Sequence, residues 1–247
     1  MVFGGFQKLT VLDYPDKVAC TLFTSGCNYA CPFCHNASLI LSAEDGGVGE
    51  QRDGGELSGM RGGYSFKGED VLDFLRNRQG LLDGVCISGG EPLLADGLEG
   101  FVDEVKALGF LVKLDTNGSF PGKLERFINA GKIDYVAMDV KNSPEKYAQT
   151  IGVADYDISP VNDSIDLLLC GAVEYEFRTT VVWEFHDEND LISIAQLISG
   201  AKKYFLQKFT CSPGVLNKGL HAYADADMRR LLSIVTKSLP IAKVRGI

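Results

Sequence analysis

Short apolar runs alternate with amphipathic stretches from residue 18 almost to the end of the chain. A short apolar run followed by a segment with helical periodicity is typical of a βα unit. The run YVAMDV at residues 135–140 is apolar up to its Asp, as expected for a parallel strand that is buried on both faces. The alternation therefore predicts an α/β protein built from repeated βα units.

The pattern predicts six strands and six helices. The strands are Val18–Phe23, Val85–Ser88, Leu111–Thr116, Tyr135–Val140, Glu174–Thr180 and Tyr204–Phe209. The helices are Gly68–Arg78, Gly97–Leu108, Lys123–Ala130, Val161–Leu169, Glu188–Ser199 and Asp225–Lys237. Such units can form an open doubly wound sheet or a barrel-like sheet that does not close, and periodicity does not distinguish the two. In both folds, ligands bind at the carboxyl ends of the strands.

The chain has 247 residues, which favours one large domain over two. Its 45% apolar and 23% charged residues are typical of a soluble globular protein. The first residues lack the basic and apolar stretches of a signal peptide, and no apolar run is long enough to span a membrane. A cytoplasmic protein without a membrane partner is therefore expected. The net charge of -9 disfavours a nucleic-acid partner.

One segment interrupts the βα rhythm. Residues 42–65 are rich in glycine and in charged residues, and they show no hydrophobic period. Because glycine gives the backbone freedom and charges prefer water, we predict a flexible surface loop within a single domain.

The seven cysteines are expected to stay reduced in a chain without an export signal. Cys27, Cys31 and Cys34 follow the first predicted strand with C-x3-C-x2-C spacing. Three thiolates on one loop suit a soft metal or an iron-sulfur cluster. A four-iron cluster held by three cysteines leaves one iron open to a substrate.

A structural zinc site and three unrelated cysteines are the competing interpretations. Zinc normally takes four ligands, and the other candidates, His186, His221, Cys170 and Cys211, form no second spaced pair. His35 is adjacent to Cys34 and would have to fold back sharply to become the fourth ligand.

The remaining cysteines are expected to have no metal role. Cys20, Cys86 and Cys170 lie in apolar runs, which predicts that they are small buried hydrophobic residues. Cys211 lies outside such a run, and its environment is left open.

Polar residues gather where the predicted strands end. Asp115 and Thr116 end the third strand and Asp139 ends the fourth, so both carboxylates are expected at the same edge of the sheet. An ordinary structural interpretation is available for each of them. Asp115 could cap a turn at Asn117-Gly118, and Asp139 could pair only with Lys141.

Several of these groups resemble the motifs of one superfamily. The C-x3-C-x2-C spacing, with Phe33 before the last cysteine, resembles the radical S-adenosylmethionine superfamily. SGGEP at 88–92, DTNG at 115–118 and MDVK at 138–141 resemble the glycyl-radical-enzyme activating proteins within it. Residues 6–36, FQKLTVLDYPDKVACTLFTSGCNYACPFCHN, and the closing KVRGI are most similar to activating proteins of anaerobic ribonucleoside-triphosphate reductase.

The resemblance implies a partial (β/α)6 barrel in which Cys27, Cys31 and Cys34 hold a [4Fe-4S] cluster. The amine and carboxylate of S-adenosylmethionine would bind the open iron. With one electron from a flavodoxin or ferredoxin, the cofactor would be cleaved to methionine and a 5'-deoxyadenosyl radical. That radical would take a hydrogen atom from a glycine of the reductase. No catalytic residue beyond the cluster ligands is required, and no side chain has to act as an acid or a base.

The resemblance also implies roles for residues around the cofactor. Gly89 and Gly90 would let the backbone approach the methionine amine, and Glu91 would fix the turn or pair with that amine. Phe33 would offer its backbone to the adenine. The other residues assigned to S-adenosylmethionine are Thr116, Asp139, Lys141 and Arg178. The residues assigned to a monovalent cation near its carboxylate are Asp115, Thr116 and Asp139.

A purely structural role is the alternative interpretation for several of these residues. Gly89-Gly90 could be an ordinary turn, Phe33 could only pack the loop, and Arg178 could only neutralise buried carboxylates. Some activating proteins carry a His at the end of the sixth strand, where this chain has Phe209 and Thr210. The alternative functions are activation of another glycyl radical enzyme such as pyruvate formate-lyase, radical chemistry on a small molecule, a single-cluster electron carrier, and a zinc scaffold.

Overall fold

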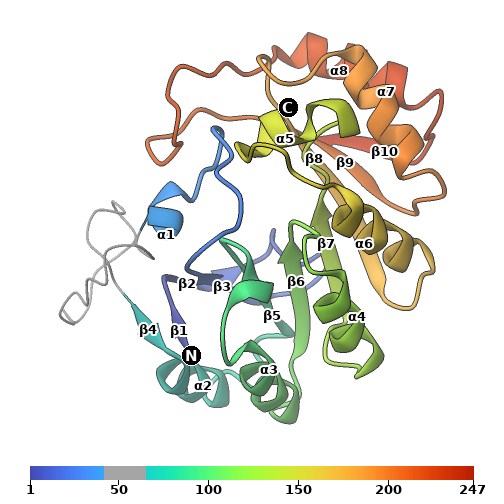
Figure 1. The fold of residues 1–247 in the computed structure, drawn as a ribbon. Coiled ribbons are helices and arrows are strands. Elements are labelled where there is room, and N and C mark those ends of the chain that lie inside the picture. The colour runs from blue at the N-terminus through green and yellow to red at the C-terminus, as the bar shows by residue number, and fades with distance from the viewer. Residues whose placement is uncertain (42–64) are drawn as a thin grey trace. The chain divides into compact units, whose positions relative to one another are not determined.

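A computed structural model describes residues 1–41 and 65–247 (Figure 1). The predicted glycine-rich loop at 42–65 therefore lies outside the described residues, except for its last position. The chain forms two compact units. The first unit contains residues 1–28, 36–115 and 130–134, and the second contains residues 29–35, 116–129 and 135–247. A single domain stays a prediction.

The first unit is built on four strands in the order β2, β3, β5 and β6. Their bounds are Gly5–Thr10, Ala19–Thr24, Gly84–Gly89 and Leu111–Thr116. β3, β5 and β6 are parallel, and β2 is antiparallel to β3. The helices of this unit are α1 (Ala37–Leu41), α2 (Gly68–Arg76) and α3 (Leu98–Ala107). A short antiparallel pair, β1 (Val2–Phe3) and β4 (Phe66–Lys67), and a 3-10 turn at Pro92–Leu94 complete it.

Burial explains why the central strands of this unit are nearly continuous apolar runs. The adjacent residues Cys20 and Thr21 of β3, which point to opposite faces of the strand, are both buried, and so are Val85 and Cys86 of β5. Residues on both faces of a strand are hidden only when both faces are covered, which is the usual condition of a parallel sheet. The apolar runs therefore predict the strands of the first unit well.

The second unit contains four parallel strands in the order β7, β8, β9 and β10. Their bounds are Tyr135–Asp139, Glu174–Val181, Tyr204–Lys208 and Ala242–Arg245. Its helices are α4 (Pro121–Asn129), α5 (Tyr147–Ile151), α6 (Ser159–Leu169), α7 (Glu188–Leu197) and α8 (Asp225–Val235), with a 3-10 turn at Pro144–Lys146. α7 begins at a capping box in which Asp187 accepts from the Asp190 backbone and Asp190 accepts from the Asp187 backbone.

Every strand and helix predicted from the sequence is present, with ends that differ by a few residues. The prediction missed the strands β1, β2, β4 and β10 and the helices α1 and α5, because each is at most six residues long and too short for a clear period. Cys20 and Cys86 are buried as predicted, and burial raises the pKa of Cys20 to about 12.

The prediction for Cys170 is wrong. Its residue is exposed and follows the last residue of α6. The buried side of α6 carries Val161, Ile165 and Leu168, which recur at helical spacing. Cys170 falls off that apolar stripe, so an apolar run in the sequence does not bury it.

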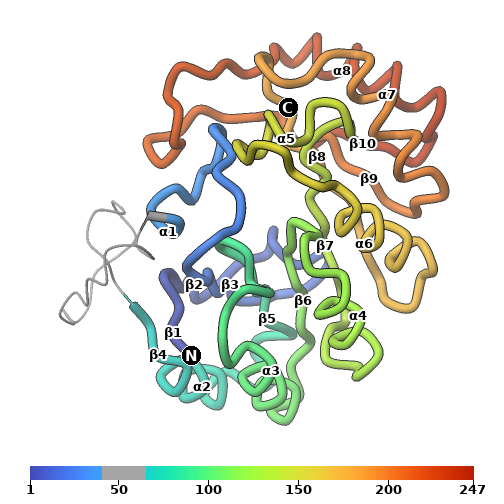
Figure 2. The backbone as a smooth tube through the Cα atoms, viewed as in Figure 1, coloured from blue at the N-terminus to red at the C-terminus, as the bar shows by residue number. Residues whose placement is uncertain are grey.

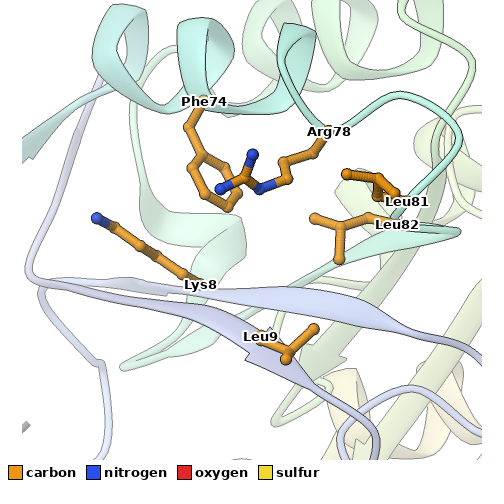
Figure 3. A pocket seen from close by; sticks show the side chains of 6 residues that line it. All are labelled: Lys8, Leu9, Phe74, Arg78, Leu81 and Leu82. Carbon is orange, nitrogen blue, oxygen red and sulfur yellow. The ribbon is translucent and has the colours of Figure 1, made fainter.

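No helix in residues 1–41 and 65–247 is both long and apolar enough to cross a membrane. The first unit has a small pocket of about 260 Å³ beside β2 and α2 (Figure 3). Lys8 and Leu9 line it from β2 and Phe74 from α2, with the Arg78 guanidinium 5.0 Å from the centre of the Phe74 ring. None of the predicted site residues lines this pocket.

One ionic cluster ties the strands of the second unit together. Glu176 of β8 is buried and accepts hydrogen bonds from both Arg245 nitrogens, Nη1 at 2.8 Å and Nη2 at 2.9 Å. Tyr135 of β7 donates to the same carboxylate at 3.0 Å. The Arg245 guanidinium also lies 3.3 Å from the centre of the Phe205 ring of β9. The arginine of the KVRGI sequence, Arg245, thus anchors β10.

We expect Arg245→Ala to lower the free energy of unfolding, because it leaves the Glu176 carboxylate buried without its cation. Breaking a buried pair costs about 3–5 kcal/mol. Because 38% of the Arg245 side chain is exposed, we expect about 2–3 kcal/mol, measured by denaturant unfolding. Arg76→Ala, which removes an exposed pair with Asp73, is the control and should cost at most about 0.5 kcal/mol. Equal losses in the two variants would contradict the anchoring role.

Candidate functional site

The cysteine loop leaves β3 through a turn that is fixed by backbone contacts in the first unit. Gly26 has φ of +87° and donates its N–H to the Leu39 carbonyl at 2.9 Å. The Gly26 carbonyl accepts from the Glu91 N–H at 2.8 Å. The backbone that leads into Cys27 is therefore set by hydrogen bonds. Figure 2 shows this segment in blue between β3 and α1.

Gly89 and Gly90 are required by close packing against the same turn. A Cβ on Gly90 would overlap the carbonyl of Gly26, and one on Gly89 would overlap the backbone of Thr24. Gly89 also has φ of +121°, which disfavours any side chain. The glycines of the SGGEP motif thus allow two strand-end loops to touch, and their predicted contact with the methionine amine stays a prediction.

Glu91 fixes the turn that follows these glycines. Its residue is wholly buried, and its Oε1 accepts from the Leu93 N–H at 3.1 Å as the cap of the short 3-10 turn. Of the two roles predicted for Glu91, the geometry displays the turn-fixing one.

The rest of the cysteine loop, residues 29–35, belongs to the second unit. The Ala30 N–H donates to the Ile151 carbonyl at 2.9 Å, and a Cβ on Gly152 would overlap the Ala30 carbonyl. Within the loop, the Cys34 N–H donates to the Cys31 carbonyl at 3.0 Å. The α5 end therefore supports the loop on one side.

The segment after β9 supports the loop on another side. The Leu216 N–H donates to the Cys34 carbonyl at 3.2 Å, and the Asn217 N–H donates to the Pro32 carbonyl at 2.8 Å. Phe33 is buried, with its ring 5.8 Å from that of Phe185. These contacts fix the loop through its backbone groups.

His35 does not fold back toward the cysteines as a zinc ligand. Its Nε2 lies 2.7 Å from the Thr210 carbonyl oxygen, which can only accept, so this nitrogen carries the proton. Its ring packs on Phe209, with the centroids 5.5 Å apart. His35 therefore contacts Phe209 and Thr210, the two residues that stand where some activating proteins carry a His at the end of the sixth strand.

A cluster of tyrosines around the loop was not foreseen from the sequence. Tyr29, between the first two cysteines, has its hydroxyl 2.7 Å from that of Tyr156, which in turn donates to Ser119 at 3.3 Å. Tyr147 stacks on Tyr156 at 6.0 Å. Burial raises the pKa of Tyr29 far above its ordinary value, so its hydroxyl stays protonated. The only signal in the sequence is the Tyr within the cysteine motif.

Asp139, Lys141 and Arg178 form one ionic group in the second unit. Asp139 accepts from the Lys141 ammonium at 2.9 Å and from Arg178 Nε at 2.9 Å. Burial alone would raise the pKa of Asp139, but Arg178 and Lys141 outweigh it and lower the pKa to about 2. Burial alone would lower the pKa of Lys141, but the charges of Asp139 and of a Cys31 thiolate raise it.

These contacts correct the interpretation that Asp139, at the end of the fourth predicted strand, pairs only with Lys141. Asp139 pairs with two cations and not only with Lys141. Their charges leave the group with one net positive charge. Arg178 neutralises the Asp139 carboxylate, as the structural interpretation of this residue predicts. Its contact with S-adenosylmethionine stays a prediction.

The backbone of Lys141 is held by a buried histidine that the sequence did not assign. His186 Nε2 lies 2.8 Å from the Lys141 carbonyl oxygen and therefore donates to it. Its Nδ1 accepts from the Val182 N–H at 3.2 Å. Burial lowers the pKa of His186, so the ring is neutral. A His186 that gained a proton would lose the bond from Val182.

Asp115 has its own cation in the first unit. Lys113, two residues earlier on β6, forms an ion pair with it, and Ser88 Oγ donates to Asp115 Oδ2 at 3.0 Å. In the turn at Asn117-Gly118, Thr116 Oγ1 accepts from the Gly118 N–H at 3.2 Å. The interpretation of Asp115 as the cap of this turn stays a prediction.

A model of the Radical SAM superfamily matches residues 21–197, which are most of the chain. The chain belongs to the radical S-adenosylmethionine superfamily. Its members use a [4Fe-4S] cluster and S-adenosylmethionine, so the predicted enzyme class and these two cofactors are confirmed.

The chain is 34% identical over 211 residues to a protein of Methanocaldococcus jannaschii named "Putative glycyl-radical enzyme activating enzyme". The match covers 83% of this chain and 79% of that protein, which confirms the resemblance to the glycyl-radical-enzyme activating proteins.

Two solved structures have a similar fold. A domain of pyruvate-formate lyase-activating enzyme from Bacteroides vulgatus has a TM-score of 0.52 with 17% identity, covering 66% of this chain and 99% of that one. Streptococcus suis SuiB bound to S-adenosylmethionine has a TM-score of 0.65 with 15% identity, covering 90% of this chain and 49% of that one. The predicted fold class, a partial (β/α)6 barrel, is confirmed.

The three cysteines of the loop suit the cluster chemically. None of the three is in a disulfide, Cys31 is buried, and Cys27 and Cys34 are half-buried. Among the described residues, no three His, Cys, Asp or Glu side chains are gathered around a point as ligands of one metal ion. Thiolates that hold a four-iron cluster bind three different irons, so they do not need to meet at one point.

His186 gives this site a measurable pH dependence. Because its folded-state pKa lies below the ordinary value of 6.5, the unfolded chain binds the extra proton more readily. The contribution of the neutral His186 ring to the free energy of unfolding is therefore complete above about pH 6.5, and it is lost as the pH falls below that value. We expect the wild type to lose more unfolding free energy than His186→Gln between about pH 8 and pH 5.

The matched control for this measurement is His221→Gln. The side chain of His221 is 77% exposed, so the variant should keep most of the wild-type pH dependence. If His186→Gln keeps the wild-type pH dependence as well, the buried neutral ring is not its source.

Proposed function

We propose that this protein activates anaerobic ribonucleoside-triphosphate reductase by forming a radical on one of its glycines. The similarity of residues 6–36 and of the closing KVRGI to that group of activating proteins supports this target. The Methanocaldococcus relative supports the broader role of a glycyl-radical-enzyme activating enzyme. Pyruvate formate-lyase is the alternative target.

The observation that carries the proposal is a loop with three closely spaced cysteines, none of them in a disulfide, whose backbone is fixed from two sides. Cys27, Cys31 and Cys34 would hold the [4Fe-4S] cluster. When bound, that cluster supplies the electron that cleaves S-adenosylmethionine to methionine and a 5'-deoxyadenosyl radical. A flavodoxin or ferredoxin is the proposed source of the electron. A single-cluster carrier would not need the polar strand ends that this chain also has.

The chain's own residues bind and orient the cofactor in this proposal. The ionic group of Asp139, Lys141 and Arg178 has one net positive charge, which suits the carboxylate of S-adenosylmethionine. His186 holds the Lys141 backbone, so this charge is fixed before the cofactor binds. Phe33 is buried, and its backbone is the proposed contact for the adenine.

The substrate glycine has to reach the cofactor on a flexible loop of the partner. Glycine suits this chemistry because its α-carbon has no side chain, which permits close approach. The proposed transfer would move a hydrogen atom from that carbon to the 5'-deoxyadenosyl radical, giving 5'-deoxyadenosine and a glycyl radical. The protein thereby transfers the radical without needing an acid or base of its own.

Single replacement of Cys27, Cys31 or Cys34 by Ala should abolish both iron-sulfur absorbance and cleavage of S-adenosylmethionine, because two thiolates do not hold the cluster. Cys170→Ala and Cys211→Ala remove exposed thiols and should change neither property. Cys20→Ala should cost about 1–3 kcal/mol of stability through lost burial and should retain the cluster. Full iron content in Cys31→Ala would rule out the assignment.

The target is tested by mixing reduced, reconstituted protein with S-adenosylmethionine and either anaerobic ribonucleotide reductase or pyruvate formate-lyase. We expect a glycyl doublet in the electron paramagnetic resonance spectrum with the reductase only, and no doublet with Cys31→Ala. A doublet only with pyruvate formate-lyase would change the target. Formation of 5'-deoxyadenosine without a doublet in either mixture would favour a small-molecule substrate.

A further inference from the structure

Lys113 is a buried lysine in the middle of β6. Its side chain is 2% exposed, and it forms an ion pair with Asp115, whose side chain is 15% exposed. Residues two apart on a strand point to the same face, so β6 itself brings this ammonium to this carboxylate. Burying an ammonium is costly unless an anion compensates it. The pair is therefore a built feature of the first unit and not a surface contact.

The neighbouring strand completes the surroundings of this pair. Cys86 of β5 lies opposite Lys113 in the sheet register, with its Sγ 3.7 Å from the lysine Nζ and 3.9 Å from Asp115 Oδ1. Ser88, two residues further along β5, donates to Asp115 Oδ2 at 3.0 Å. Asp115 thus already receives an ammonium and a hydroxyl from its own unit.

The charges of the predicted cation ligands are already balanced by the chain. Asp115 and Lys113 sum to zero, and Asp139 with Lys141 and Arg178 sums to plus one. The third predicted ligand, Thr116, uses its hydroxyl to accept from the Gly118 N–H. A further cation on these residues would be repelled by cations within ion-pair distance, and that repulsion is strong away from water. These residues do not fit a monovalent cation site.

We propose that the Lys113 ammonium takes the place of a monovalent cation at Asp115, so that this protein binds S-adenosylmethionine without an alkali-metal ion. The ammonium supplies the same single positive charge from within the fold, and it is present at every salt composition. The inference does not depend on which enzyme is activated, since both of its tests use this protein alone.

The first test compares thermal unfolding of full-length, reconstituted protein in KCl, NaCl and choline chloride at equal ionic strength. Wild type should show the same Tm in all three. Lys113→Met should lose on the order of 10 °C in choline chloride, because the Asp115 carboxylate loses the buried ammonium that pairs with it. KCl or NaCl should restore part of that loss by supplying the missing cation.

Two control variants separate this effect from general salt stabilisation. Lys106→Met also removes a lysine from an ion pair of the first unit, but its partner Asp134 is 28% exposed, so its Tm should show no preference among the salts. Lys113→Met/Asp115→Asn removes both charges, and its Tm should not respond to the choice of cation. A Lys113→Met protein that is equally stable in all three salts would overturn the inference.

The second test needs only the wild type and remains decisive if Lys113→Met does not fold. Binding of S-adenosylmethionine to the reconstituted protein is measured by equilibrium dialysis in the same three salts. The expected Kd is the same in each. An affinity that is tenfold or more higher in KCl or NaCl than in choline chloride would show that an alkali-metal ion is used, and the inference would fail.

Discussion

Buried charge at the ends of β6 and β7 is the constraint on which the site depends. Carboxylates and ammonium groups are costly to remove from water, and here each carboxylate meets a cation of its own unit. Asp115 pairs with Lys113, and Asp139 pairs with Lys141 and Arg178. Because these pairs form within the fold, the polar strand ends are in place before any cofactor binds, and the surplus positive charge lies in the second unit.

The cysteine loop follows a different principle, since it is held by backbone groups. Its carbonyls and N–H groups bond to Ile151, Leu216 and Asn217, while Gly89 and Gly90 permit contact with the turn before Cys27. Hydrogen bonds to the backbone fix a loop without using its side chains. The fold of the loop thus does not depend on disulfides of its cysteines, and the protein's task is to place the cofactor and exclude water around it.

Much of the fold could be predicted because parallel strands buried on both faces leave a clear pattern in the sequence. The apolar runs give every predicted strand within a few residues, whereas the short strands β1, β2, β4 and β10 were not predicted. The same reasoning failed for Cys170, which lies beside apolar residues in sequence but off the buried stripe of α6. No prediction was made for Lys113 either, because a lone lysine in an apolar run gives no sign that it is buried against Asp115 two positions later.

The sequence by itself determined the succession of βα units, the spacing of Cys27, Cys31 and Cys34, and through its motifs the superfamily. These are local properties, carried by residues that are close in the chain. Only the tertiary structure decided that His186 holds Lys141, that His35 bonds to Thr210, and that Arg178 shares Asp139 with Lys141. Those contacts join residues more than thirty positions apart, and no periodicity in the sequence records which distant groups the fold brings within hydrogen-bond distance.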